Sequence, residues 1–116
     1  MLQDIIKILE KTKLFNIEVI DLKQKTDMVH YSLVCSSISY RQRISAAYML
    51  KNFSREYGLK FFGMEGTFEN SEWVLVDLSD IVIHIMSEES RRNYSLENFL
   101  LQKLYAVNRI HRKSYC

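Results

Sequence analysis

The sequence of 116 residues contains no proline and only three glycines. Linkers between domains are usually rich in proline, glycine or serine, and no such stretch, repeat or low-complexity segment occurs here. A chain of this length also has no room for a second independent core. We therefore expect one domain over residues 1–116, with a core of about residues 1–104 and a basic tail over residues 105–116.

Cysteine and long hydrophobic runs are equally scarce. Cys35 lies in an apolar run and Cys116 is the last residue, so the sequence indicates no disulfide framework, which is typical of a reducing cytosol. Charged residues such as Asp4, Lys7 and Glu10 interrupt the N-terminal apolar residues, unlike a signal peptide, and no segment is long enough to span a bilayer. We expect a soluble, cytoplasmic protein.

Apolar residues make up 47% of the chain, enough for a core without metals or disulfides, and the charges are unevenly placed. The net charge of +2 conceals an acidic region in which only Arg91 and Arg92 oppose the acids Glu65, Glu69, Glu72, Asp77, Asp80, Glu88, Glu89 and Glu97. The tail that follows has basic residues and no acid. An acidic region repels nucleic acid and suits a basic protein partner, although ordinary solvated surface charges look the same.

Hydrophobic periodicity predicts eight elements in the order helix, strand, strand, helix, strand, strand, strand, helix. A capping box of Ser39 and Gln42 starts the second helix, Gly58 ends it, and Ser87 caps the third. The expected ranges are 2–13, 17–22, 28–35, 39–57, 60–64, 73–78, 81–86 and a final helix after residue 87. One long helix between two strands indicates a mixed sheet of about five strands with flanking helices, an α/β or α+β fold.

Asp77 and Asp80 form the obvious carboxylate pair. Two acids near a strand end could hold Mg²⁺ for nucleotidyl transfer. Such enzymes also need a loop that grips phosphates, and the possible counterpart, residues 35–39, has neither glycine nor lysine. We therefore favour a corner role for both aspartates in the turn at Ser79 and Asp80, where they would add surface charge.

Other candidate chemistry is weaker. Cys35 and His84 could be a nucleophile and its base, but both lie in apolar runs predicted to be buried strands, where a thiol behaves as a small hydrophobe. A histidine in such a strand is more often hydrogen-bonded within the structure, and the same reading applies to His30. The spacing of the histidines and cysteines indicates no zinc site. We expect no cofactor, no metal and no catalytic residue.

Aromatic residues beside the acids leave two interpretations open. Trp73 opens its strand, and Tyr94 lies in the last helix near Arg91. Core packing explains them, and so does a protein-binding hot spot. The basic tail, with its interleaved Tyr105 and His111, is suited to RNA phosphates or is a solvated end.

One long stretch resembles a known family. The run from Trp73 to Met86, WVLVDLSDIVIHIM, is similar to the hallmark stretch of the ribosomal silencing factor family, also called RsfS or Iojap. The pattern continues through residues 88–97 without a gap. Upstream, Ser39 with Arg41-Gln42 resembles the family's serine-x-arginine helix start, and Glu65-Gly66 its glutamate-glycine loop. The resemblance spans roughly Asp21 to Leu100 and is specific through its length.

Three departures from the family pattern stand out. The family usually has glycine where this chain has Ser79 and Ser37, and leucine-tryptophan where it has Phe99-Leu100. Serine reaches positive φ less easily than glycine, so the first two bear on turn geometry. The third removes an aromatic side chain that is available for packing or contact.

The resemblance implies a small mixed-sheet domain, related in architecture to nucleotidyltransferases but without their catalytic activity. It also implies a translational repressor that binds large-subunit ribosomal protein fourteen and blocks joining of the small subunit when nutrients run short. We expect the partner-binding residues to be Trp73, Asp77, Asp80, Glu88, Glu89, Arg91, Tyr94 and Glu97. Alternatives are a magnesium-dependent nucleotidyltransferase, or an RNA-binding module that uses the tail. Self-association as a homodimer is left open.

Overall fold

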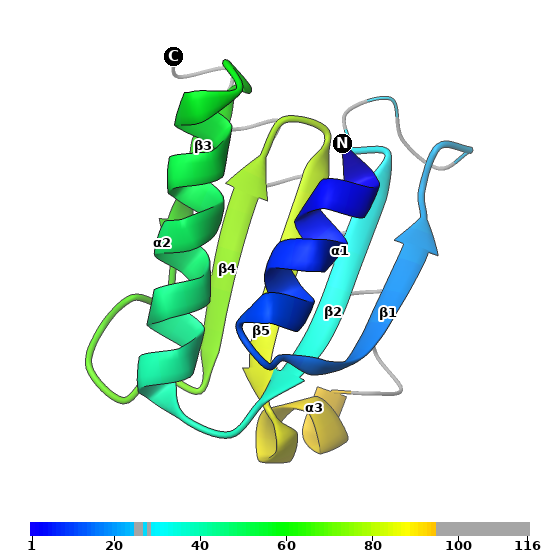
Figure 1. Cartoon of the computed structure of the whole chain (residues 1–116). Helices are drawn as coiled ribbons and strands as arrows, with labels where there is room; N and C mark the ends of the chain where they lie inside the picture. Colours follow the sequence, from blue (N-terminus) through cyan, green and yellow to red (C-terminus); the bar gives the residue numbers. More distant parts are fainter. Residues whose placement is uncertain (25–26, 28, 95–116) are drawn as a thin grey trace.

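The computed structural model describes residues 1–24, 27 and 29–94, with Tyr94 described by its backbone alone. Glu97, the Phe99-Leu100 pair and the basic tail lie outside these residues. The eight elements occur in the predicted order (Figure 1), and their bounds are α1 (Leu2–Lys11), β1 (Phe15–Asp21), β2 (Tyr31–Ser37), α2 (Tyr40–Glu56), β3 (Phe61–Glu65), β4 (Trp73–Leu78), β5 (Ile81–Ser87) and α3 (Glu88–Tyr94).

The five strands form one mixed sheet in the order β1-β2-β5-β4-β3, which confirms the expected fold class. The central strands β2 and β5 run parallel, whereas the other neighbours are antiparallel. Parallel strands require a crossover, and here the chain passes through α2, β3 and β4 before it returns beside β2. Because β2 and β5 are parallel, their carboxyl ends meet at one end of the sheet.

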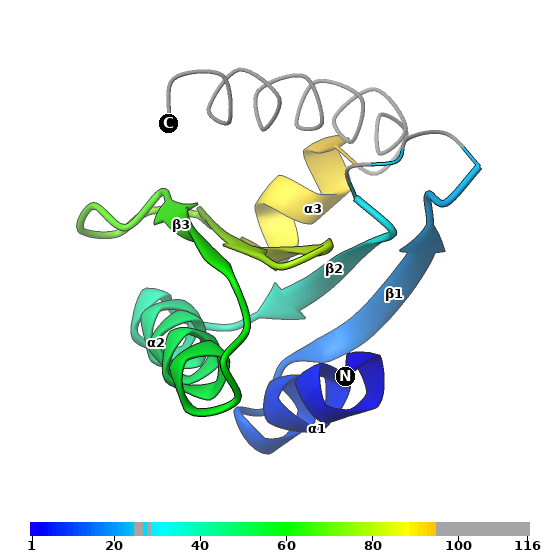
Figure 2. The ribbon, with the colours of Figure 1, turned by 90° about the horizontal axis from the view of Figure 1, so that it is seen from above.

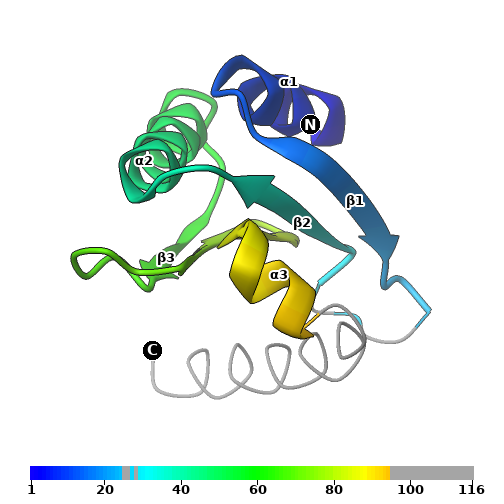
Figure 3. The same ribbon diagram turned by 90° about the horizontal axis from the view of Figure 1, so that it is seen from below.

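Helices α1 and α2 cover one face of the sheet, and α3 lies on the opposite side (Figures 2 and 3). Each strand alternates its side chains between the two faces. The helix-covered face holds the main core, to which α1 contributes Ile5 and Leu9 and α2 contributes Ala46, Ala47 and Leu50. Among the described residues, no helix is long and apolar enough to cross a membrane.

Strand β2 begins at Tyr31, three residues later than the apolar run from residue 28 predicted. Val29 explains the error, because it is buried without being part of the strand. It packs with Leu22, Leu75 and Val82 in a second apolar cluster. The apolar side chain of Val29 therefore indicated burial, but not a place in the strand.

The start of α2 confirms the predicted cap and adds a second function to it. Ser39 Oγ accepts a hydrogen bond from the Gln42 backbone N–H at 3.1 Å. The Gln42 side chain reaches one residue further back than a capping box requires, and its Oε1 accepts from the Ile38 N–H at 2.7 Å. Its Nε2 donates to the carbonyls of Thr12 and Lys13, which joins α2 to the end of α1.

The β4–β5 hairpin turns at Ser79 and Asp80, as predicted. Ser79 takes the positive φ of 54° that glycine would adopt without strain, and its N–H donates to the Lys60 carbonyl at 2.6 Å. The departure from glycine at this position therefore leaves the turn in place. Gly66 also has a positive φ, and a Cβ there would overlap the carbonyl oxygen of Trp73.

Candidate functional site

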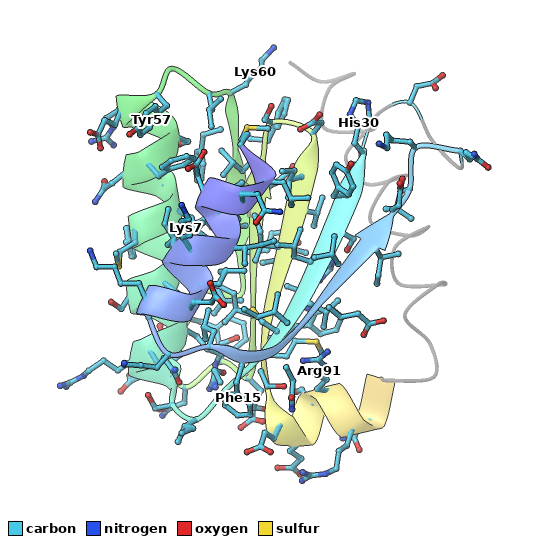
Figure 4. All side chains as sticks on the ribbon, turned by 45° about the vertical axis from the view of Figure 1, so that its right-hand side comes forward. Lys7, Phe15, His30, Tyr57, Lys60 and Arg91 are labelled. Atoms are coloured by element: carbon cyan, nitrogen blue, oxygen red, sulfur yellow. The ribbon has the colours of Figure 1, made fainter. Side chains whose placement is uncertain are left out.

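The structure separates the residues that the sequence grouped into one site. Asp80 precedes β5 and Glu88 follows it, so the strand between them places the two residues about 26 Å apart. Figure 4 shows the two ends of the sheet, with His30 at one and Arg91 at the other. We call the end that carries α3 and the carboxyl ends of β2 and β5 the α3 end. Trp73, Glu88, Glu89 and Arg91 belong to it, and Asp80 does not.

At the opposite end, Asp80 binds the residues at which the chain enters β2. Its Oδ2 lies 2.7 Å from Nδ1 of His30, and its carbonyl accepts from the backbone N–H groups of His30 and Tyr31. Asp80 is thus a corner residue, as predicted. His30 lies outside the strand and is partly exposed, which corrects the expectation of a buried strand position.

The expectation that Asp77 lies at the corner or on an outer surface is wrong. Asp77 lies within β4, opposite Val82 of β5, and is 0% exposed. The strand continues to Leu78, and alternation turns Asp77 to the sheet face away from α1 and α2. Asp80, in the turn, binds His30, so the two aspartates do not converge on one site. Within the described part of the chain, no group of three or more His, Cys, Asp or Glu residues is placed to hold a metal ion.

Cys35 and His84 are buried, as predicted, and lie on opposite faces of the sheet. Cys35 belongs to the core under the helices, whereas His84 pairs in register with Val34 and Leu75 on the other face. Burial raises the pKa of the Cys35 thiol to about 12, so the nucleophilic thiolate is disfavoured. The thiol Sγ lies 3.5 Å from the His84 carbonyl oxygen and does not meet the imidazole as a nucleophile would.

Trp73 is anchored at the α3 end by this buried histidine. The indole Nε1–H donates to His84 Nδ1 at 3.1 Å, and the two rings lie 5.7 Å apart between centroids. Burial lowers the pKa of His84 to about 4, which agrees with a neutral ring that accepts at Nδ1. Trp73 remains partly exposed, so one part of the side chain packs on His84 and another part is open to solvent.

A buried arginine that the sequence did not single out organises the same end. Arg43 of α2 donates from Nε to the Ser71 carbonyl and from Nη1 to Ser37 Oγ, both at 2.9 Å. Ser37 Oγ in turn donates to the Met86 carbonyl at 2.8 Å. The guanidinium therefore ties the carboxyl ends of β2 and β5 to the loop between β3 and β4. A glycine at position 37 would lack this hydroxyl.

The junction of β5 and α3 is fixed by a second polar group. Ser87 Oγ accepts from the Ser90 N–H at 3.1 Å, which confirms the predicted cap. The same hydroxyl donates to Glu72 Oε2 at 2.6 Å, and the Ser87 N–H donates to the Glu72 carbonyl. These bonds hold Glu72 of the β3–β4 loop beside the start of α3, where Glu88 and Glu89 lie.

Arg91 fastens α3 to the edge of the sheet. Its Nη1 donates to the Asn16 carbonyl and, at 3.0 Å, to Ser36 Oγ, and its Nη2 lies 3.4 Å from Glu18 Oε2. A shallow cleft of about 280 Å³ opens beside it, lined by Asn16, Ser36, Glu88, Arg91 and Arg92. Arg91 thus makes its hydrogen bonds within the chain, whereas the sequence predicted that it contacts a partner.

Comparisons with known proteins agree with this fold. The chain is a small α+β domain that presents exposed acids at its α3 end. The family model described as "Ribosomal silencing factor during starvation" matches residues 1–113. The chain belongs to the ribosomal silencing factor family, which is a family of regulatory proteins and not of known enzymes.

Individual relatives show the same likeness over most of the chain. Ribosomal silencing factor RsfS of Halalkalibacterium halodurans is 29% identical over 97 residues, which cover 84% of this chain and 82% of that protein. The protein of the same name from Bacillus subtilis is 34% identical over 82 residues, 71% of this chain and 69% of that one. A crystal structure of a Chromobacterium violaceum protein superposes with a TM-score of 0.75 at 32% identity and covers 85% of each chain.

Proposed function

We propose that this chain is a translational repressor that binds the large ribosomal subunit through large-subunit ribosomal protein fourteen. It then sterically blocks joining of the small subunit, and so lowers translation under nutrient limitation. Membership of the silencing factor family supports this proposal, because the relatives carry that name. The observation that assigns the proposed binding to particular residues is the exposed acidic start of α3, where Glu88 and Glu89 face solvent.

The charges at the α3 end suit a basic protein surface. Glu69 and Glu72 of the β3–β4 loop are exposed, as are Glu88 and Glu89, and the Ser87–Glu72 hydrogen bond brings the two segments together. Ribosomal proteins are basic, so complementary charges speed their encounter with this end and set the orientation of binding. Trp73 supplies a partly buried aromatic at the same place. Asp77 has no exposed surface for contact, and Asp80 lies at the other end.

Gradient sedimentation tests the binding. Added protein is expected to comigrate with the large subunit and to shift assembled ribosomes toward separate subunits. Comigration with the small subunit alone would contradict the proposal. The same gradient run with the chain shortened by residues 110–116 separates binding by the acidic end, which survives the deletion, from binding by the basic tail to ribosomal RNA.

A charge reversal locates the surface. The double variant Glu88→Lys, Glu89→Lys is expected to weaken binding to the large subunit at least tenfold and to reduce its dependence on salt. Glu56→Lys is the matched control, because this exposed acid ends α2 at the opposite end of the molecule. Equal losses in both variants would show a general charge effect without a defined docking end.

A further inference from the structure

Two large apolar side chains are exposed at the α3 end without a packing role. Ile38 is 81% exposed and Phe68 is 71% exposed, more than any other large apolar residue that the described part of the chain leaves exposed. Ile38 lies in the connection from β2 to α2, and Phe68 in the loop from β3 to β4. Both connections reach the same lower end of the molecule as α3 (Figure 1).

The backbone that carries these two residues is held in place. Tyr40 Oη donates to the Thr67 carbonyl at 2.8 Å, which joins the start of α2 to the residue before Phe68. The Ile38 N–H is bound by Gln42, and the Phe68 carbonyl accepts from the Ser71 N–H at 3.1 Å. A segment ordered in advance loses less conformational entropy on binding than a flexible one, so exposed side chains on it are suited to anchor a partner.

Acidic side chains accompany this apolar pair. Glu69 and Glu72 belong to the same loop as Phe68, and Glu88 and Glu89 begin the neighbouring helix α3. Exposed cations lie nearby as well, Lys13 before β1, Arg41 in the first turn of α2 and Arg92 in α3, and the four acids still outnumber them. Apolar centres within a charged rim are the usual anatomy of protein interfaces. The rim repels phosphate groups, and a symmetric pairing of two copies of this chain would bring two acidic rims together.

We infer that Ile38 and Phe68 are the apolar anchors of the docking surface, and that they insert into apolar recesses on a basic protein. This inference rests on the proposed function and identifies where binding energy arises at that site. The acids orient the partner and accelerate encounter, whereas the two anchors slow dissociation. Each anchor therefore acts on a different kinetic constant from the charges around it.

Serine substitutions test the anchors. Ile38→Ser and Phe68→Ser are each expected to weaken binding to purified large subunits about tenfold, and the double variant more, chiefly through faster dissociation. The control is Tyr57→Ser, because Tyr57 is also exposed, at 65%, and lies at the far end of α2 (Figure 4). Unfolding midpoints of the two anchor variants should stay close to the parent, since neither side chain is buried.

The outcomes separate the two proposals. If the parent chain binds large subunits and the anchor variants bind equally well, the anchors are wrong and the proposed function stands. If the parent chain does not bind, both fall. Sedimentation equilibrium at tens of micromolar gives the third arm: a dimer that Phe68→Ser dissolves would assign this surface to a second copy of the chain and overturn the inference.

Discussion

Trp73 and His84 lie on neighbouring antiparallel strands and are joined side chain to side chain, indole N–H to Nδ1, at 3.1 Å. The bond requires an unprotonated Nδ1, and burial independently favours the neutral ring. A histidine that sequence reasoning could offer as a catalytic base is therefore the support of an aromatic side chain. Its burial makes the stability of the fold depend on pH.

The free energy of unfolding should fall as the pH drops from about 6.5 to about 4, because in this range His84 is protonated in the unfolded chain and neutral in the folded chain. The pKa of His84 is about 4 in the fold, against an ordinary value of 6.5. Between these values the unfolded chain binds the proton and the folded chain does not, so acid favours unfolding. The full effect is about 3 kcal/mol. Urea unfolding at pH 7.5 and 4.5 measures most of this effect, and His84→Asn, with no group to titrate, should show a smaller difference between the two pH values.

Gly66→Ala should destabilise the fold far more than Gly58→Ala. Both glycines have positive φ, which an alanine adopts at a cost of about 1–2 kcal/mol. At Gly58 the added methyl meets open space, whereas at Gly66 it overlaps the Trp73 carbonyl oxygen. We expect a loss of about 2–5 kcal/mol at Gly66, measured by thermal or denaturant unfolding. Equal losses at the two positions would show that the β3–β4 loop moves freely.

Ser79→Gly should stabilise the hairpin. Glycine relieves the positive φ at the turn, retains the N–H that binds the Lys60 carbonyl, and loses more entropy on folding. The balance is a gain of about 0.5–1 kcal/mol in the free energy of unfolding. Ser45→Gly is the matched control, because this exposed serine lies inside α2, where glycine costs about 0.5 kcal/mol. A loss at both positions would count against strain at Ser79.

Arg91→Ala should loosen α3 from the sheet. The change removes the hydrogen bonds to the Asn16 carbonyl and Ser36 Oγ together with the ion pair to Glu18, at an expected cost of about 1–3 kcal/mol. Arg55→Ala removes an exposed arginine from the last turn of α2 and should cost about 0.5 kcal/mol. Hydrogen exchange of the α3 amides adds a local readout, and unchanged protection there would contradict the role of Arg91 as a fastening.

Local sequence signals predicted the elements well, because each has a local cause. The caps at Ser39 and Ser87 and the helix stop at Gly58 are chemistry between near neighbours. The hairpin around Ser79 was predicted for the same reason. The order of elements followed from these signals and from the spacing of apolar residues.

Contacts between residues that are far apart in the sequence could not be predicted from local patterns. Strands β4 and β5 are apolar on both faces, so alternation did not show that Asp77 points inward. The buried contacts of Arg43 join residues 28 positions apart, which no local pattern encodes. Ile38 and Phe68 resemble core residues in composition, and only their place on the fold shows them exposed. The candidate site was thus predicted as one group of residues, whereas the fold divides it between two ends.

The parallel pairing at the centre of the sheet has a consequence for how the chain folds during its synthesis. Bonded partners in β2 and β5, such as Ser37 and Met86, are 49 positions apart, whereas β4 meets β5 across a two-residue turn. Closing the longer loop costs more chain entropy, so the hairpin forms readily and the central pair late. Until residue 87 has emerged, β2 has only its edge partner β1. The nascent chain therefore completes its sheet only when most of its length has been made.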